Sequence, residues 1–179
     1  QRAVFANPIA SKYLSRGQAE HTLQWKDRQT GIDCKARLDF LSEVDGKPFI
    51  IDLKGTPDVR ADFFRRDAGR NAYHQQLGWY REGYATVTGY EDVPCLILAV
   101  EFNAPHDVAV FRLEEEAIYA GHADCQDMLQ RVATCRMENR WPGLYETEQE
   151  LVLRKWDLDL DQNDDSELVK ELDFTEEND

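Results

Sequence analysis

The sequence predicts an α/β domain, with one mixed β-sheet flanked by helices. Three observations support this class. The predicted elements run helix, three strands, helix, two strands, helix, which suits a mixed sheet with helices around it. Asp45-Gly46 lies between two apolar runs and is a strong signal for a hairpin between neighbouring strands. The 179 residues are 42% hydrophobic and 31% charged, which is typical of one globular domain.

The first part of the chain predicts one helix and three strands. The helix is expected over residues 2–16. Residues 20–26 alternate between apolar and polar, and residues 32–41 alternate strictly, as half-buried strands do. After the Asp45-Gly46 turn, residues 48–54 predict the third strand.

The second part predicts two long helices around two strands. Residues 59–84 predict a helix, and residues 95–102 predict a buried strand with a partner over residues 107–113. Residues 114–139 predict the last helix. Gly69 and Gly78 are the expected weak points of the first of these helices.

The charge of the chain is concentrated at its end. Residues 157–179 hold eleven Asp or Glu and one Lys, a charge of −10 out of a total of −14, which leaves −4 for residues 1–156. The sequence therefore predicts a folded domain over residues 1–156 and a solvated acidic tail over residues 157–179. The acidity of the tail does not exclude a polyanionic ligand for the domain.

Cysteine spacing and hydropathy bear on the compartment. The four cysteines lack a Cys-x-x-Cys pair, which favours free thiols in a reducing cytosol over disulfides or zinc. No apolar run reaches the roughly 20 residues of a membrane helix. A cytoplasmic protein without membrane attachment is expected, and because the chain begins without Met, we expect a preceding N-terminal segment to be missing.

The hairpin brings two carboxylates together. With Asp45-Gly46 as a two-residue loop, paired positions place Phe40 against Ile51 and Asp39 against Asp52. The same register extends to Leu38 with Leu53 and to Arg37 with Lys54.

Opposed carboxylates repel unless they share a proton or a cation. Mg²⁺ prefers one or two carboxylates with waters and phosphate oxygens, and Lys54 on the same face could orient or deprotonate a water. The alternative is a solvated hairpin face, where mixed charges are ordinary.

These residues resemble the PD-(D/E)XK nuclease superfamily, whose signature is an acidic residue, a hairpin and (D/E)-x-K. Here Asp39 precedes Asp52-Leu53-Lys54, with Leu38 in place of the proline. Gln76-x-x-x-Tyr80 resembles the Q-x-x-x-Y motif of the RecB, lambda-exonuclease and exonuclease VIII branch. The stretches "GQAEHTLQWKDRQTGIDCKARLDFL", "AYHQQLGWYREGY" and "ENRWPGLYE" resemble the nuclease domain of exonuclease VIII of the RecE type, over about residues 10–156.

The resemblance implies a restriction-endonuclease-like core and a Mg²⁺-dependent exonuclease, with Mn²⁺ as a possible substitute. Such an enzyme digests double-stranded DNA ends 5′ to 3′ and leaves 3′ tails for a single-strand annealing recombination protein. It implies metal binding by Asp39, Asp52 and the Leu53 carbonyl, with Glu20 in support. Lys54 would activate the attacking water, and Gln76 and Tyr80 would hold the active face. It also implies a bacterial or phage origin and a homo-oligomeric ring, either trimer or tetramer.

Two further points concern DNA binding and a departure from the family. Arg66 and Arg70 lie four residues apart and could follow a phosphate backbone, with Arg60 and Arg65 nearby, although each could instead belong to a salt-bridged surface. The family's upstream G-x-x-x-H motif is absent. Alternatives are an endonuclease, a RecB-like module, or a non-catalytic scaffold that binds a recombination partner.

Overall fold

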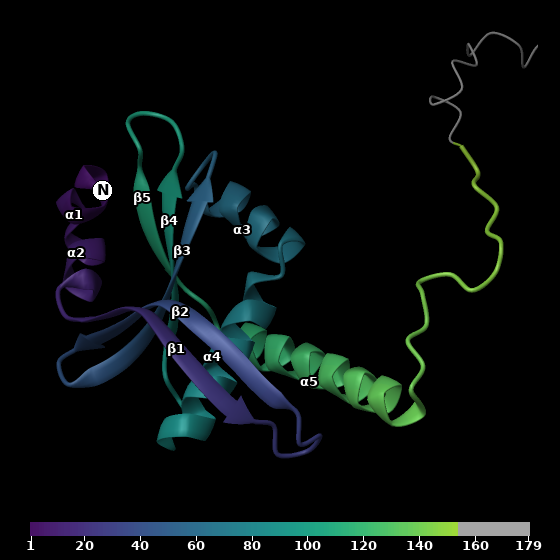
Figure 1. The fold of residues 1–179 in the computed structure, drawn as a ribbon. Coiled ribbons are helices and arrows are strands. Elements are labelled where there is room, and N and C mark those ends of the chain that lie inside the picture. The colour runs from purple at the N-terminus through teal and green to yellow at the C-terminus, as the bar shows by residue number, and fades with distance from the viewer. Residues whose placement is uncertain (154–179) are drawn as a thin grey trace, which may run out of the picture. The chain divides into compact units, whose positions relative to one another are not determined.

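The computed structural model describes residues 1–153, which contain one five-stranded sheet and helices on both of its faces (Figure 1). The strands lie in the order β1-β2-β3-β4-β5. Only the β3–β4 pair is parallel, so the sheet is mixed and the predicted fold class is confirmed. The elements are α1 (Arg2–Ala6), α2 (Pro8–Leu14), β1 (Gly17–Lys26), β2 (Asp33–Val44), β3 (Lys47–Thr56), α3 (Ala61–Arg70), α4 (Tyr73–Thr88), β4 (Cys95–Glu101), β5 (Val108–Arg112) and α5 (Glu115–Glu138).

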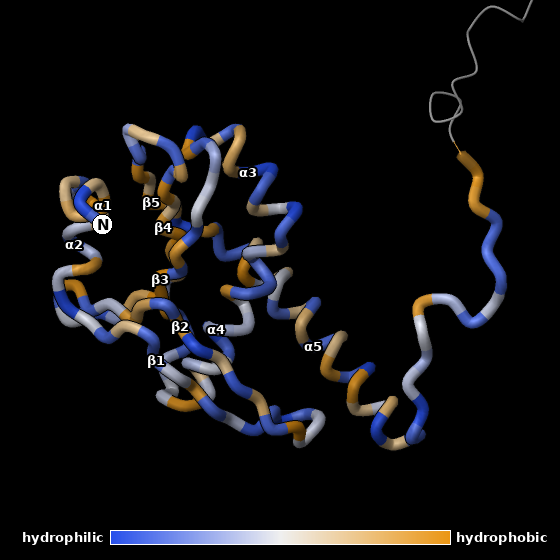
Figure 2. The backbone as a smooth tube through the Cα atoms, turned by 45° about the horizontal axis from the view of Figure 1, so that its top comes forward, coloured by the Kyte–Doolittle hydropathy of each residue, from blue (hydrophilic) through white to orange (hydrophobic). Residues whose placement is uncertain are grey.

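Each face of the sheet has its own hydrophobic core. α1 and α2 cover one face, where Ala10 of α2 packs with Ile51, Leu96 and Leu98. α3, α4 and α5 cover the other, where Leu38, Leu77, Ile97 and Ile118 belong to a larger cluster. Figure 2 shows hydrophobic residues gathered along β3, β4 and β5, between the two helical layers.

The β2–β3 hairpin has the predicted register over five pairs. They run from Val44 with Lys47, beside the turn, to Phe40 with Ile51. The ladder ends there, so three predicted pairs are wrong: Asp39 with Asp52, Leu38 with Leu53 and Arg37 with Lys54. Beyond this point β2 pairs with β1 alone, while β3 pairs in parallel with β4 as far as Thr56. We call the opening between the two strands the fork.

The fork opens where the two acidic residues would meet. Asp39 and Asp52 come next in the register, and like charges directly opposite each other destabilise a sheet. The Asp39 carboxylate instead accepts the Leu53 backbone N–H, at 2.7 Å. A side chain thus takes the place of a ladder bond at the point where β2 leaves β3.

Two predicted helices are broken, each at a specific backbone feature. The helix expected over residues 2–16 is α1 and α2, because Asn7 precedes Pro8 and is extended, with ψ 118°. The Asn7 side chain then caps α2 by accepting the N–H groups of Ile9 and Ala10. The helix expected over residues 59–84 is α3 and α4, separated at Ala72, which has φ 53°.

Gly78 is not the weak point that the sequence suggested. It lies inside α4, where a Cβ atom would be 2.5 Å from the backbone nitrogen of His122 on α5. In the same way, a Cβ atom on Gly121 would lie 2.1 Å from the backbone oxygen of His74 on α4. The two glycines let α4 and α5 pack with their backbones close together. This packing fixes the position of α4 against the sheet.

Trp141 begins a second compact unit. Its described residues, 141–153, contain no helix or strand, and the acidic tail predicted over residues 157–179 lies outside the described residues. In the part of the chain that the structure describes, no helix has the length and hydropathy needed to cross a membrane. The four cysteines are free, as the sequence predicted.

Candidate active site

Asp52 and Lys54 of β3 form a buried ion pair inside the fork. Nζ of Lys54 lies 2.5 Å from Oδ2 of Asp52. The Asp52 side chain is 0% exposed and that of Lys54 is 16% exposed. Oδ2 is nevertheless without a well-aligned hydrogen bond, so the charge contact does not satisfy this oxygen fully. A carboxylate kept out of water in this way needs a positive partner.

Gln76 of α4 joins the ion pair to Tyr80. Its Nε2 donates to Oδ1 of Asp52 at 2.9 Å and to the Tyr80 hydroxyl at 2.7 Å. Its Oε1 accepts from Nζ of Lys54 at 2.9 Å. The amide therefore presents its donor to the carboxylate and its acceptor to the ammonium group. The four-residue spacing places Gln76 and Tyr80 on one face of α4, as the sequence predicted.

Burial changes the acidity of two groups in this network. Burial raises the pKa of Asp52, the Lys54 ammonium group offsets part of that rise, and the nearby Asp39 carboxylate adds to it. Burial also raises the pKa of Tyr80, although its hydrogen bond with Gln76 acts in the opposite direction. Both shifts follow from low water access around a concentrated set of charges.

Glu20 lies beside Asp39 but makes its own ion pair. Its neighbours in β1 pair as Ala19 with Phe40 and His21 with Leu38, so the β1–β2 register places Glu20 across from Asp39. Glu20 has φ 55°, and its carboxylate contacts Nε of Arg37 at 2.8 Å. Among the described residues, no three acidic, His or Cys side chains form a group that could hold a metal ion. Direct ligation by Glu20 stays a prediction.

The four arginines predicted to bind DNA differ in their partners. Two nitrogens of Arg60 contact the same oxygen of Asp58: Nε lies 2.9 Å and Nη2 lies 2.6 Å from Oδ2. Arg65 forms an ion pair with Asp62. Among the described residues, no carboxylate pairs with Arg66 or Arg70. These two guanidinium groups on α3 are therefore available for phosphates.

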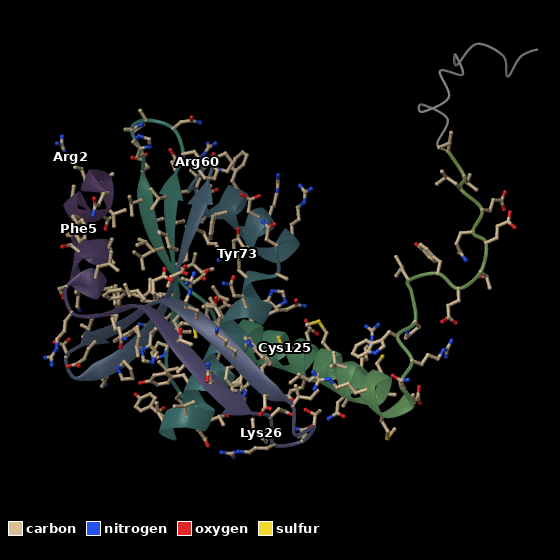
Figure 3. The ribbon with its side chains drawn as sticks, in the orientation of Figure 1. Arg2, Phe5, Lys26, Arg60, Tyr73 and Cys125 are labelled. Carbon is tan, nitrogen blue, oxygen red and sulfur yellow. The ribbon has the colours of Figure 1, made fainter. Side chains whose placement is uncertain are left out.

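Tyr73 is a residue of the site that the sequence analysis missed. It begins α4, where Figure 3 labels it. Its ring centroid lies 4.8 Å from Nζ of Lys54. The spacing of Tyr73, Gln76 and Tyr80, three and then four residues apart, is the signal that could have found it. Such residues share one face of a helix.

Comparison with known proteins places the chain in a family. The family model for the PDDEXK-like domain of unknown function, DUF3799, matches residues 1–150. The chain belongs to this family. No curated protein matches the sequence.

Two solved structures are similar to this PDDEXK-like domain. A crystal structure of a candidate exonuclease from Eubacterium rectale has a TM-score of 0.59 and 18% sequence identity, and the alignment covers 88% of this chain and 62% of that one. The chain therefore spans less than two thirds of that protein, and at this identity the likeness shows the fold. A second structure, SSO0001, has a TM-score of 0.38 and 16% identity, with 64% and 50% of the two chains covered, and this carries no argument.

PDDEXK nucleases generally use divalent metal ions, and the residues at the fork fit one. Oδ2 of Asp52 is a buried oxygen without an aligned hydrogen bond, and Asp39 brings a second carboxylate close enough to raise the pKa of Asp52. Two carboxylates with further oxygen donors from water and phosphate suit a hard divalent ion. Asp39 and Asp52 would hold it, and the backbone carbonyl of Leu53 stays a predicted third ligand.

Proposed function

We propose that this PDDEXK-like domain is a Mg²⁺-dependent double-strand DNA exonuclease that digests 5′ to 3′ and makes 3′ single-stranded tails for homologous recombination. Mn²⁺ would substitute for Mg²⁺. The observation that carries the nuclease reaction is the arrangement of Asp39, Asp52, Lys54 and Gln76 at the fork. The direction of digestion rests on the resemblance of the sequence to exonuclease VIII.

The side chains at the fork have separate roles in this proposal. A bound divalent ion would polarise the scissile phosphate and lower the pKa of a bound water. Lys54, largely buried, offers a fixed positive charge to the phosphate and to the attacking water, in a site where electrostatic stabilisation is strong. Gln76 keeps both Lys54 and Asp52 in one orientation, and Tyr80 in turn fixes the Gln76 amide.

Unpaired arginines on α3 support binding of the DNA backbone. α3 follows β3 directly, so its residues come soon after Lys54 in the chain. Arg66 and Arg70 lie four residues apart and can contact successive phosphates of one strand. We assign the main contacts to these two, because Asp58 and Asp62 already neutralise Arg60 and Arg65.

Assembly and a partner belong to the same proposal. The −4 charge of residues 1–156 is unfavourable for a monomer that holds DNA. A trimer or tetramer would gather the basic faces of several copies around the duplex, and a single-strand annealing protein would receive the 3′ tail. Sedimentation of the purified chain tests the assembly directly, and a monomer at all concentrations would contradict it.

Digestion of linear duplex DNA tests the central reaction. With Mg²⁺, a duplex labelled at its 5′ ends should release label as short products early, while a 3′ label stays on long strands and a closed circle stays intact. Cutting of the circle would identify an endonuclease instead. Absence of any cutting, together with equal Mg²⁺ binding by wild type and Asp52→Ala, would identify a non-catalytic scaffold.

A lysine pair provides the matched control. Lys54→Ala should reduce kcat by about 100-fold or more, in line with the loss of one preorganised charged group at a reacting centre. Lys47 lies exposed beside the hairpin turn of the same strand, so Lys47→Ala should leave the rate unchanged. Equal rates for both variants would remove Lys54 from the mechanism.

A further inference from the structure

An apolar groove of about 510 Å³ opens beside the candidate active site. Val4 and Phe5 of α1 form one side, and Leu53 of β3 and Phe102, just after β4, contribute to the other. Figure 3 shows Phe5 on the α1 layer and Tyr73 on the opposite helical layer, so the groove and Tyr73 approach the fork from different sides. Asp39 and Lys54 also line the groove, so the groove reaches β3 beside the fork. The ammonium group of Lys54 itself lies on the α4 side of the strand.

Large apolar side chains around this groove are exposed. Phe102 is 64% exposed, Phe5 is 55% exposed and Leu53 is 53% exposed. A single exposed apolar residue is ordinary, but a group around one cavity marks a binding site more often than chance. Small-ligand sites have volumes of a few hundred Å³ with apolar walls and few polar groups, as this one does.

The ring of Phe102 packs against β3 at Gly55, the residue after Lys54. A Cβ atom on Gly55 would lie 2.2 Å from Cε1 of Phe102, so the ring occupies the space that any other residue at 55 would fill. The Phe102 backbone N–H donates to the Thr56 carbonyl at 3.0 Å, which ties the two chain segments together. An exposed aromatic face therefore lies on the groove side of β3, against the residue that follows Lys54, at a position that glycine makes possible.

We propose that the groove binds the unpaired nucleobase of the nucleotide next to the scissile phosphate, with the base stacked on Phe102. This proposal rests on the proposed nuclease function and names the form of DNA that its site accepts. A phosphate bound at the fork would carry its attached nucleoside past Leu53 toward the groove side of β3. That base must leave its partner strand, so the site acts on a locally opened end.

The groove should accept all four bases. Every base offers a flat face for stacking, whereas distinguishing bases needs free donors and acceptors at their edges. Of the acidic groups in the lining, Glu101 uses Oε1 to accept the Val59 N–H at 3.0 Å, and Asp39 accepts the Leu53 N–H. Few polar atoms remain for reading a base, as suits an enzyme that digests any sequence.

A substrate series with single abasic sites tests the proposal. A tetrahydrofuran abasic nucleotide is placed at each successive position from the end of a linear duplex, and kcat/KM is measured for wild type and Phe102→Ala. In wild type, an abasic nucleotide at one position should lower kcat/KM by about 5- to 100-fold, the range expected for one stacked base. Phe102→Ala should lower kcat/KM on the intact duplex by a similar factor. The abasic nucleotide should then lower kcat/KM of Phe102→Ala no further.

The proposed base site would be overturned if the effects of the abasic nucleotide and of Phe102→Ala on kcat/KM were additive. It would also be overturned if no abasic position changed kcat/KM of the wild type. Phe102→Trp should retain the wild-type pattern, because it keeps an aromatic face. Tyr90 is a matched control, since it is 42% exposed and lies outside this groove, and Tyr90→Ala should behave as wild type.

A binding measurement separates this proposal from the nuclease function itself. Fluorescence anisotropy with Ca²⁺ in place of Mg²⁺ gives Kd for intact and abasic duplex without hydrolysis, for wild type and for Phe102→Ala. Intact DNA should bind more tightly only when Phe102 is present. If wild type digests no DNA while this difference persists, the nuclease proposal fails and the base site stands. If wild type digests DNA but binds intact and abasic duplex with the same Kd, only the proposed base site is contradicted.

Discussion

The ring of Tyr73 lies over the ammonium group of Lys54, with its centroid 4.8 Å from Nζ. Tyr73 follows the break at Ala72, which turns the start of α4 toward the fork. Its ring neighbours Phe64 at 6.1 Å, and Phe64 stacks on Phe111 at 4.8 Å. An aromatic cluster of the core therefore supports the face on which Lys54 rests, and the electrostatic attraction of ring and cation fixes the amine.

Substitution of Tyr73 should lower the chemical rate more than DNA binding. Tyr73→Leu keeps apolar bulk but removes the ring, so kcat should fall about tenfold while KM for DNA stays nearly constant, in line with one partly desolvated cation–π contact. Tyr73→Phe keeps the ring and should retain the rate. Steady-state digestion of linear duplex measures both constants. A Phe variant as slow as the Leu variant would assign the effect to the hydroxyl group instead.

Replacement of Gln76 by glutamate should lower kcat strongly, although the two side chains have nearly the same shape. The Gln76 amide donates to Asp52 and to Tyr80, and glutamate would present a carboxylate oxygen to Asp52 in place of a donor. A fall of about 100-fold in kcat is expected, comparable to loss of one oriented donor at a reacting centre.

The neighbouring glutamine supplies the control for that change. Nε2 of Gln75 donates to Asp124 of α5, away from the fork, so Gln75→Glu should leave kcat within about twofold. Digestion rates at saturating DNA compare the two variants. If both lose the same factor, the Gln76 effect is a general disturbance of α4.

The hairpin register was predictable because its signals are local. Asp45-Gly46 specifies the turn, and alternation from Phe40 to Val44 allows only one pairing with β3. The end of that pairing was not predictable in the same way. It depends on β4, which joins β3 in parallel along its far edge, and on the Asp39 carboxylate, which takes the Leu53 N–H.

The site residues were predictable in part for a related reason. Gln76 and Tyr80 stand out through their spacing, and the structure joins them to Asp52 and Lys54. Tyr73 reaches Lys54 only because the chain breaks at Ala72. Gly69 signals a weak point three residues earlier, but neither Gly nor Pro stands at the residue with positive φ. Backbone strain of this kind is set by tertiary packing, which local patterns do not record.

The arginines of α3 should separate into two pairs in a salt titration. Arg66→Gln and Arg70→Gln remove cations without a carboxylate partner, so each should weaken DNA binding and lower the slope of log Kd against log salt by about one. Arg60→Gln and Arg65→Gln also leave Asp58 or Asp62 unneutralised, but they remove no free cation and should change the slope less. Equal slopes for all four variants would contradict assignment of the contacts to Arg66 and Arg70.

Asp52 should make stability depend on pH in a direction that reveals its burial. Its pKa is raised above the ordinary value of 3.8, mainly by burial, so the folded protein holds this proton to higher pH than the unfolded chain does. Its contribution to the free energy of unfolding is therefore complete below pH 3.8 and is lost as pH rises through the raised pKa. Asp52→Asn is neutral throughout and lacks this loss.

Urea unfolding with EDTA from pH 4 to pH 7 should therefore show wild type losing stability relative to Asp52→Asn as pH rises. Mg²⁺ at pH 7 should restore wild type, because an ion that binds only the folded state stabilises it by mass action, and should leave Asp52→Asn nearly unchanged. A difference between the two proteins that is constant with pH would mean that water reaches Asp52. Equal stabilisation of both by Mg²⁺ would place the ion away from the fork, since an amide cannot replace a buried carboxylate as a hard-metal ligand without a large loss of affinity.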